Sequence, residues 1–305
     1  ASRGLGDVYK RQALSVANGA VAGDGATKLA KMTHSSSGLS SEQLKNRGHL
    51  RGYETLTAAM ERSAVEEALR GNLAILAKDA SGTPVAFTGL QIPGVLDALY
   101  ASAAREAGGL GVHFNDGVPT LKLWAPTAKS VALQLFDSED ATGDPASLPM
   151  EHQADGTWTI TGESAWKNRA YRYNVEVFVP STNQVEHNVV TDPYSVGLTV
   201  DSTHSVLVDL SDPDYMPTLW QTSEAPVITN DSARSIYELH VRDFSIGDTT
   251  VPEKLRGTYE AFALEDSAGV KQLRELAAAG MNMVHILPTF DIATIPEKRA
   301  EQKVA

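Results

Sequence analysis

Two carboxylates in the last quarter of the chain, Asp243 and Asp291, are of a residue type that can carry out hydrolysis. Each lies near the C-terminal end of a segment that reads as a strand. Glycoside hydrolysis uses a pair of carboxyl groups, and a separation of about 5–5.5 Å gives retention of configuration. Asp at a strand end more often caps a loop or binds backbone amides. We therefore favour a structural role for both residues.

Two histidines, His240 and His285, fall in the same two predicted strands and invite a metal-ligand interpretation. No third ligand at a spacing typical of a metal site accompanies them. A histidine in this setting is more often a satisfied interior residue. The chain also contains no cysteine, which excludes a thiolate metal site, a disulfide and a cysteine nucleophile. The sequence therefore predicts no metal site.

Three tryptophans, Trp124, Trp158 and Trp166, are candidates for stacking on sugar rings, because an aromatic face suits the apolar face of a sugar. Trp124 leads from a strand into the turn Trp-Ala-Pro, and Trp158 follows the turn Asp155-Gly156. Either residue can therefore belong to a core. Trp166 is the least constrained by strand pattern, so it is the predicted substrate-binding residue.

The element that positions the first of these groups is a strand predicted over Ser235 to Ser245, where Tyr, Val, Ile and Phe are frequent. Alternation places Glu238, His240 and Arg242 on one face. Such a polar face needs partners from neighbouring strands, as the interior of a closed barrel provides. The alternative is an antiparallel strand with one wet face.

A helix is predicted next, over Ser267 to Gly280, with Val270, Leu273 and Leu276 on one face. A second strand is predicted over Met283 to Pro288. Strand, helix and strand in this order form a βαβ unit, which implies a parallel pair.

The middle of the chain, from Val112 to about Leu210, has the pattern of a β-sandwich, with several short alternating strands separated by Pro, Gly, Asp and Asn. The clearest strands are 120–124, 130–136, 157–161 and 171–179. In the last strand Tyr171, Tyr173, Val175, Val177 and Val179 share one face, as a sandwich core requires. Residues 211–231 contain three prolines and read as a linker.

Before the sandwich, the sequence predicts short helices at 41–43 and 64–69, a hairpin of 72–77 with 83–87, and a helix that starts at Pro93. Residues up to about Gly38 are rich in Gly, Ala and Ser and read as loop or weak strand. Residues 2–12 show no periodicity and resemble a peptide encoded by sequencing-adapter DNA. We exclude them from the predicted fold.

Composition limits the classes of partner. The 305 residues include 42% hydrophobic and 21% charged residues, as in a globular protein, and the net charge is −12. This charge argues against nucleic acid and anionic membranes as partners. No apolar run is long enough to span a membrane. The compartment stays open between cytoplasm and cell exterior.

The stretch 236–245 resembles the first barrel strand of pullulanases, which are α-1,6-glucan debranching enzymes of the α-amylase superfamily (glycoside hydrolase family 13). Residues 250–262 are similar to their next connecting segment, and 285–294 resemble their second strand and its exit loop. Residues 88–100 resemble the stretch before their carbohydrate-binding-like module. The motifs Trp-Ala-Pro-Thr-Ala at 124–128 and Asp-Pro-Tyr at 192–194 resemble their immunoglobulin-like starch-binding module of family 48. The resemblance runs through most of the chain from about Gly38.

This resemblance implies a multi-domain chain with five parts. These are an excluded segment at 1–12, a partial α+β accessory domain at 13–108, an immunoglobulin-like β-sandwich at 109–212, a linker at 213–231 and the truncated start of a (β/α)8 TIM barrel at 232–305. The implied activity is hydrolysis of α-1,6 bonds in pullulan, starch or glycogen dextrins with retention. The implied partner is an α-glucan.

Family members carry their catalytic groups on later barrel strands, and a whole barrel takes about 250 residues. Their Tyr-Asn-Trp-Gly-Tyr-Asp stretch after the second strand is absent here. We therefore assign no catalytic residue, expect this chain alone to be inactive, and predict no cofactor; calcium in full-length members is not readable from this sequence. The alternatives are a non-catalytic glucan-binding protein and a related isoamylase or branching-type enzyme.

Two strands and one helix of a barrel have little to cover them. We therefore expect the apolar face of Val270, Leu273 and Leu276 and the strand edges to be exposed. Residues after about Asp231 are then expected to be poorly ordered or prone to aggregation.

Overall fold

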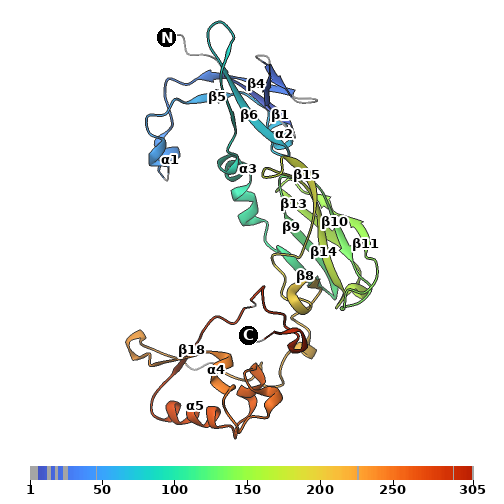
Figure 1. The fold of residues 1–305 in the computed structure, drawn as a ribbon, viewed down its shortest axis with the longest axis vertical. Helices are drawn as coiled ribbons and strands as arrows, with labels where there is room; N and C mark the ends of the chain where they lie inside the picture. The colour runs from blue at the N-terminus through green and yellow to red at the C-terminus, as the bar shows by residue number, and fades with distance from the viewer. Residues whose placement is uncertain are drawn as a thin grey trace. The chain divides into compact units, whose positions relative to one another are not determined.

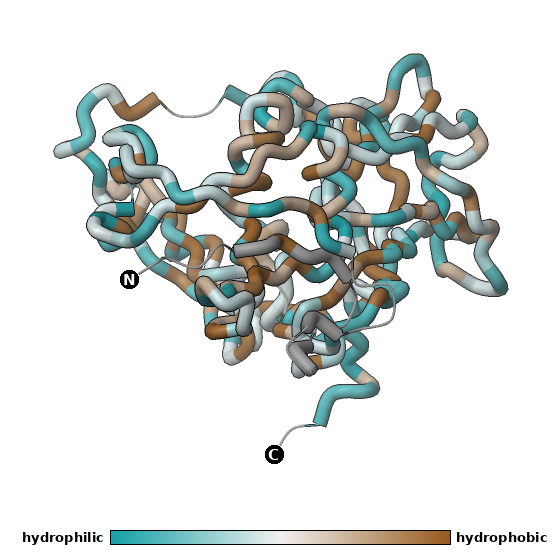
Figure 2. The backbone as a smooth tube through the Cα atoms, turned by 90° about the horizontal axis from the view of Figure 1, so that it is seen from above, coloured by the Kyte–Doolittle hydropathy of each residue, from teal (hydrophilic) through white to brown (hydrophobic). Residues whose placement is uncertain are grey.

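The structure is a computed structural model that describes residues 6–11, 15–17, 20–22, 27–45, 47–224, 227–290 and 292–303. It contains two compact units, 1–211 and 212–305. Figure 1 follows the chain from the blue N-terminal sheet through the green and yellow sandwich to the red C-terminal unit. In Figure 2 the tail that leads to the C-terminus is hydrophilic, and its charged residues 297–303 are exposed.

A five-stranded antiparallel sheet opens unit 1, with the strand order β5-β4-β1-β6-β7. A separate two-stranded hairpin of β2 and β3 lies outside it. The strands are β1 (Gly6–Arg11), β2 (Ser15–Ala17), β3 (Ala20–Ala22), β4 (Thr27–His34), β5 (Leu56–Ala58), β6 (Asn72–Lys78) and β7 (Pro84–Gly89). The predicted hairpin is confirmed as β6 and β7.

The exclusion of residues 2–12 from the fold was wrong for Gly6–Arg11, because these residues form β1, the central strand of this sheet, while residues 2–5 and 12 lie outside the described residues. Its register with β6 is unbroken from Gly6 opposite Ala77 to Arg11 opposite Asn72. Val8 is 94% buried, with a relative exposure of 6%. A strand paired on both sides gains two ladders of backbone hydrogen bonds, so a segment without clear periodicity can still be a strand. The eight-residue β4 likewise exceeds the weak strand expected before Gly38.

Three helices accompany this sheet: α1 (Ser41–Leu44), α2 (Arg62–Ala68) and α3 (Pro93–Glu106). All three were predicted. Ser40 caps α1 in a capping box with Gln43, and Pro93 occupies the first turn of α3, where no amide is needed. Buried Ala68, Leu69 and Leu73 form the local core against the apolar faces of α2 and α3.

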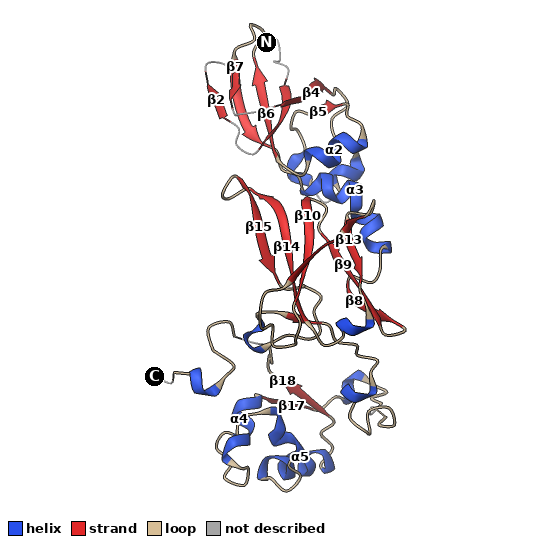
Figure 3. Ribbon diagram, turned by 90° about the vertical axis from the view of Figure 1, so that its right-hand side faces the viewer, coloured by secondary structure: helices blue, strands red, loops and turns tan. Residues whose placement is uncertain are grey.

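The β-sandwich has two antiparallel sheets, with strand orders β11-β10-β14-β15 (β16 also pairs with β14) and β12-β13-β9-β8. Figure 3 shows both sheets in red. The strands are β8 (Gly111–Asn115), β9 (Val118–Trp124), β10 (Ala128–Leu135), β11 (Ala146–Pro149), β12 (Glu151–His152), β13 (Thr157–Thr161), β14 (Ala170–Val179), β15 (Gln184–Val190) and β16 (Ser205–Val206). The four strands predicted most clearly are confirmed as β9, β10, β13 and β14.

The sandwich core lies between these sheets. Leu121 comes from one sheet, Leu133, Tyr171 and Tyr173 come from the other, and all four are fully buried. Burial of one such side chain stabilises the fold by about 1.5–3 kcal/mol. The predicted shared face of β14 is confirmed at Tyr171 and Tyr173, while Val177 and Val179 are only half-buried.

A buried carboxylate closes one end of this core. Asp192 is 3% exposed, and it accepts hydrogen bonds from the hydroxyls of Tyr171 (2.8 Å) and Tyr173 (3.1 Å) at Oδ2. The Tyr194 amide donates to its Oδ1 at 2.8 Å. Burial, followed by the charge of Asp192, raises the pKa of both tyrosines. The Asp-Pro-Tyr motif therefore fastens the chain after β15 to β14.

Unit 2 contains a parallel pair, β17 (Ile236–Leu239) and β18 (Met283–Ile286), with α5 (Ala268–Ala278) between them in sequence. Ser267 caps α5 through its side chain, which accepts from the Val270 amide at 3.3 Å. Gly280 follows the helix with φ +102°, a left-handed conformation that glycine adopts at little cost. The predicted βαβ order and parallel pairing are confirmed.

The strand predicted to run to Ser245 was wrong beyond Leu239, because Val241–Ser245 form the short helix α4. Two contacts account for this helix. Phe244 stacks on Phe262 at 4.2 Å between ring centroids, and buried Ser245 accepts a hydrogen bond from the Gly257 amide at 2.8 Å. Such tertiary contacts outweigh the strand preference of Val and Phe.

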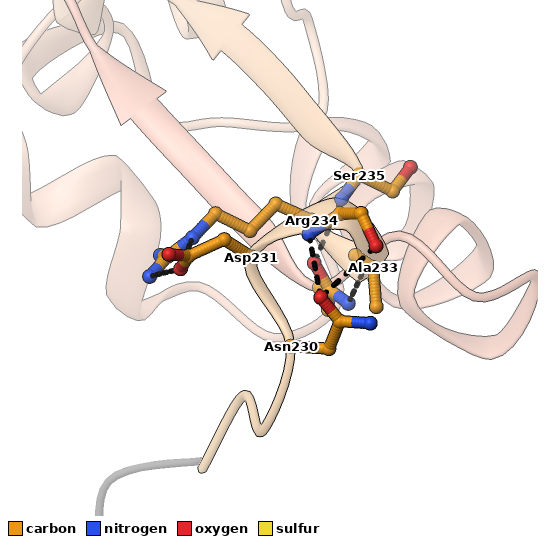
Figure 4. Close-up of polar contacts among 7 residues, drawn as sticks. Asn230, Asp231, Ala233, Arg234 and Ser235 are labelled. Carbon is orange, nitrogen blue, oxygen red and sulfur yellow. Dashed lines mark hydrogen bonds and ion pairs between the residues drawn. The ribbon is translucent and has the colours of Figure 1, made fainter.

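The entry to β17 is tied to the start of β18 by one side chain. Asn282 accepts from the Ser235 amide at 3.0 Å through Oδ1 and donates to the Ala233 carbonyl at 2.9 Å through Nδ2. Asn230 caps the preceding turn by accepting from the Ser232 amide at 3.0 Å. Figure 4 shows this turn, in which Asp231 and Arg234 form an ion pair. The Asn282 side chain thus holds the register of the two parallel strands.

Apolar side chains of the parallel pair are exposed, as the sequence predicts for this region. Ile236 is 54% exposed, Val284 46% and Ile286 47%. The face of Val270, Leu273 and Leu276 is half-buried, and α5 has no buried residue. No helix among the described residues is long and apolar enough to cross a membrane.

Candidate functional site

The outer face of the sheet formed by β10, β14 and β15 carries a row of polar side chains. The register sets Gln134 opposite Arg172 and Ser130 opposite Glu176, while Leu133 and Tyr173 point to the core. Because side chains alternate along a strand, these polar residues share the face away from the core.

Three polar atoms on this face lack partners. Gln134 Oε1, Arg172 Nε and Asn174 Oδ1 are buried and make no hydrogen bond to any residue that the structure describes. Buried polar groups in proteins are nearly always satisfied, so adjacent exceptions indicate a place where a polar ligand or solvent supplies the partner. Next to them Ser130 Oγ donates to Glu176 Oε2 at 2.7 Å.

An aromatic residue supports the row at its end. The Arg172 guanidinium lies 5.6 Å from the Phe136 ring centroid, within cation–π range. His204 contacts the same ring edge-on at 4.8 Å. Burial and then the charge of Arg172 lower the pKa of His204, which favours its neutral form at pH 7. This face can therefore offer donors and acceptors to a neutral, hydroxyl-rich molecule.

The three tryptophans singled out by sequence occupy different environments. Trp158 is 6% exposed, belongs to the core, and donates from Nε1 to the Ala125 carbonyl at 3.0 Å. Trp124 is 38% exposed and lies beside Gly156, where an added Cβ would be 3.3 Å from its ring nitrogen. Trp158 is therefore a core residue, and Trp124 offers only part of its ring to solvent.

Trp166, the predicted binding residue, is half-buried in a 3-10 turn (Ser164–Trp166) before β14. Its ring packs against the sandwich core. The ring also lies directly over Gly162, because a Cβ there would be 2.2 Å from it. The residue thus contributes to packing, and its role toward a ligand stays a prediction.

Sequence reasoning missed Gln134, Arg172 and Asn174. A signal was present, since Arg172, Asn174 and Glu176 alternate with the apolar residues of β14. It also did not consider Trp220, which is 69% exposed in the segment that was read as a linker.

The residues of the βαβ region come together only in part. Glu238 and His285 face each other across the parallel pair with 3.1 Å between Oε2 and Nδ1, and both are exposed. This pairing supplies the neighbouring-strand partner expected for Glu238. Asp243 is exposed and forms an ion pair with Arg242 at 3.1 Å, whereas Asp291 lies outside the described residues.

His240 is opposite no histidine, because His285 pairs in register with Glu238. Within the described ranges, no group of three His, Cys, Asp or Glu side chains is arranged to hold a metal ion. Because Asp291 lies outside the described residues, the structure does not test the pairing of Asp243 with Asp291.

Comparison with known proteins gives two family matches in order along the chain. Residues 7–98 match the Pullulanase N2 domain, and residues 109–195 match carbohydrate-binding module 48, the isoamylase N-terminal domain. The chain is 35% identical over 282 residues to pullulanase 1, chloroplastic, of Arabidopsis thaliana, which covers 92% of this chain and 29% of that protein. It is 37% identical over 254 residues to a pullulanase of Klebsiella pneumoniae, covering 82% and 23%.

Solved structures agree with these matches. A Klebsiella pneumoniae pullulanase complexed with maltotriose superposes with a TM-score of 0.87 at 32% identity, over 96% of this chain and 28% of that one. PulA from Klebsiella oxytoca gives a TM-score of 0.86 at 34% identity, over 97% and 28%. The chain spans less than a third of the length of these relatives. With both matched domains in order and similarity over 92% of its length, the chain corresponds to an amino-terminal part of pullulanases.

Proposed function

We propose that this chain is part of a debranching glycoside hydrolase that cleaves α-1,6-glucosidic bonds in pullulan, starch or glycogen dextrins with retention of configuration. The observation that carries the proposal is the order of the two matched domains on one chain. Similarity to pullulanases also continues beyond them, over 92% of the chain. Retention requires a carboxylate nucleophile and a carboxylic acid on either side of the scissile bond.

In this proposal β17, α5 and β18 are the first βαβ unit of a (β/α)8 barrel. Their parallel pairing and helical connection suit that role. The proposed parts are an accessory domain at 13–108, the sandwich at 109–212, a linker at 213–231 and the barrel start at 232–305, with β1 added to the first. The catalytic pair belongs to other strands, so this chain by itself releases no sugar.

The sandwich contributes α-glucan binding in the proposal, with the outer face of β10, β14 and β15 as the contact surface. Unpaired Gln134 Oε1, Arg172 Nε and Asn174 Oδ1 would exchange hydrogen bonds with sugar hydroxyls. The row of polar side chains carries one cation, Arg172, and one carboxylate, Glu176, so these two charges balance, which suits an uncharged polysaccharide. Trp166 remains a second proposed contact.

Affinity electrophoresis in gels containing amylopectin tests the binding. The parent chain should be retarded, and Asn174→Ala should weaken the apparent affinity about two- to tenfold, as expected for one lost hydrogen bond. Asn188→Ala is the matched control, because Asn188 pairs with Val175 on the core side of the same sheet. If amylopectin does not slow the parent chain, the proposed glucan binding is refuted.

Trp166→Ala needs a second measurement, because its ring packs on the core. Loss of retardation supports a binding role only if the variant unfolds at the same urea concentration as the parent. If the unfolding midpoint falls in parallel, Trp166 acts through packing alone and the proposed contact is withdrawn.

Reducing-sugar release from pullulan tests the catalytic part. We expect none from this chain, and any release from it would contradict the placement of the catalytic pair on other strands; loss of that release in Asp243→Asn would assign a catalytic role to Asp243. Strong glucan retention with no pullulan activity, in a protein whose coding frame stops after Ala305, favours the non-catalytic glucan-binding alternative.

One relative is a glycogen debranching enzyme of Yersinia enterocolitica, 26% identical over 59% of this chain. Cleavage of glycogen dextrins in preference to pullulan by the full-length protein would favour this isoamylase-type alternative.

A further inference from the structure

A concave site lies in the accessory domain, outside the sandwich. A pocket of about 380 Å³ opens between the end of β4, α1 and the loop that leads into β5. The lining includes His34, Tyr53, Glu54 and Thr55. The Ser35 amide donates to the Thr55 carbonyl at 2.8 Å, which continues the β4–β5 ladder and holds the two sides of the pocket together.

An exposed aromatic ring stands at this pocket. Tyr53 is 71% exposed, one of the most exposed large side chains described in the chain. Gly52 beside it has φ +91°, a left-handed conformation that other residues rarely adopt. The backbone therefore turns sharply at Gly52. Contact between an exposed aromatic ring and the apolar face of a ligand removes apolar surface from water, which stabilises the complex.

Polar groups around the ring match a hydroxyl-rich ligand. His34 Nε2 and Glu54 Oε2 lie 2.6 Å apart, within hydrogen-bond distance. Thr55 Oγ1 is buried and has no hydrogen-bond partner among the described residues, although Thr55 lines the pocket. A buried hydroxyl in this position indicates that a polar ligand or solvent completes its bonding. Partly buried Leu39, Leu44 and Leu50 supply the apolar part of the lining.

We propose that this pocket, with Tyr53 as stacking platform and the His34–Glu54 pair as hydrogen-bonding edge, is an oligosaccharide-binding site that takes a short α-glucan segment. The choice of α-glucan rests on the proposed function; the chemistry of the pocket by itself selects a neutral polyhydroxylated ligand. The site extends glucan contact from the sandwich to the accessory domain. When a branched polysaccharide is bound at one of these sites, its effective concentration at the second site on the same chain is raised.

Maltotriose titration followed by ¹H–¹⁵N NMR tests the site on the whole chain. We expect the amides of residues 34–38 and 50–55 to shift with added maltotriose. Tyr53→Ala should raise the Kd at this site about tenfold, the change expected from losing about 55 Å² of apolar contact. Tyr53→Phe should stay within about twofold, because the ring is retained, and Glu54→Gln should weaken binding about fivefold.

Tyr259→Ala is the control, since Tyr259 is 62% exposed in the other unit and should leave the titration unchanged. Tyr53 is exposed, so its substitution does not endanger folding. Equal affinity of Tyr53→Ala and parent, or an absence of shifts at 34–38 and 50–55, would overturn the pocket proposal.

The two proposals fail in different ways. If Asn174→Ala weakens amylopectin retardation, Tyr53→Ala leaves it unchanged, and maltotriose causes no shifts at 34–38 and 50–55, the sandwich binds and the pocket does not. If Asn174→Ala has no effect while Tyr53→Ala abolishes both retardation and maltotriose shifts, the pocket binds and the sandwich face does not. If the parent responds to neither glucan, both are refuted.

Discussion

The β-sandwich and the βαβ region use similar apolar strands but bury them very differently. In β10 and β14, Leu133, Tyr171 and Tyr173 are fully buried, because a second sheet covers their face. In β17 and β18, Ile236, Val284 and Ile286 are about half-exposed. Apolar alternation in a sequence thus identifies the strands, but the amount of burial depends on what packs against them.

The polar residues of the two regions differ in the same way. Asp192 is enclosed by the hydroxyls of Tyr171 and Tyr173. The Glu238–His285 pair is similarly short at 3.1 Å but lies in solvent. An exposed ion pair contributes about 0–1 kcal/mol, whereas hydrogen bonds to a buried charge contribute about 1.5–3 kcal/mol each. The sandwich should therefore resist unfolding far better than the parallel pair.

The largest expected effect comes from truncating one leucine in each region. Leu133→Ala should lower the free energy of unfolding of the sandwich by about 2–5 kcal/mol, because it leaves a cavity in a closed core. Leu276→Ala on half-buried α5 should cost less than about 1.5 kcal/mol. Urea unfolding followed by tryptophan fluorescence, to which buried Trp158 contributes, checks the first, and hydrogen exchange of the α5 amides checks the second. Equal costs would mean that the α5 face is covered in solution, and the contrast would not hold.

A smaller effect is expected from loss of the two side-chain hydrogen bonds of Asn282. Asn282→Ala removes two hydrogen bonds between the start of β18 and the backbone at Ala233 and Ser235. The Ser235 amide should then exchange at least about fivefold faster, as expected for one lost hydrogen bond. Asn230→Ala is the control, because its bonds stay within the turn to Ser232. The same exchange experiment compares β17 with β14, and equal protection of the two strands in the parent would refute the predicted weakness after Asp231.

The smallest effect concerns acid. The Thr250 hydroxyl and then the Thr250 amide, with a further bond from the Gly269 amide at 3.1 Å, lower the pKa of Asp248 below its usual 3.8. A carboxylate with a lowered pKa stabilises the fold at pH values above 3.8, and this contribution is lost as the pH falls through the lower folded value. At pH values below about 4, the hydrogen-exchange protection of the Gly269 amide should therefore decrease in the parent. Asp248→Asn should show weaker protection already at pH 7 and less change with acid.

Asp266→Asn serves as control for the acid experiment, because Asp266 pairs with the Lys271 side chain at 3.6 Å near the start of the same helix. It should keep the pH response of the parent. If Asp266→Asn flattens that response as Asp248→Asn does, the effect comes from general charge near α5 and not from the Asp248 bonds.

Local patterns were enough to predict the strands of the sandwich, the βαβ order and the ends of α5. Ser267 and Gly280 mark that helix because a side-chain cap and a left-handed glycine act within a few residues. Resemblance in the segments 124–128, 192–194, 236–245 and 285–294 was enough to identify the family, and the comparisons confirm it.

Only the tertiary structure decided the rest. β1 is a strand because β4 and β6 flank it, and Val241–Ser245 are helical because Phe262 and Gly257 hold Phe244 and Ser245. Trp166 was predicted to bind substrate because the strand pattern constrains it least, yet its ring packs against the core over Gly162. The unpaired atoms of Gln134, Arg172 and Asn174 and the pocket beside Tyr53 emerge only when distant segments are brought together. A linear pattern records which residues are polar, but not which of them the fold leaves without a partner.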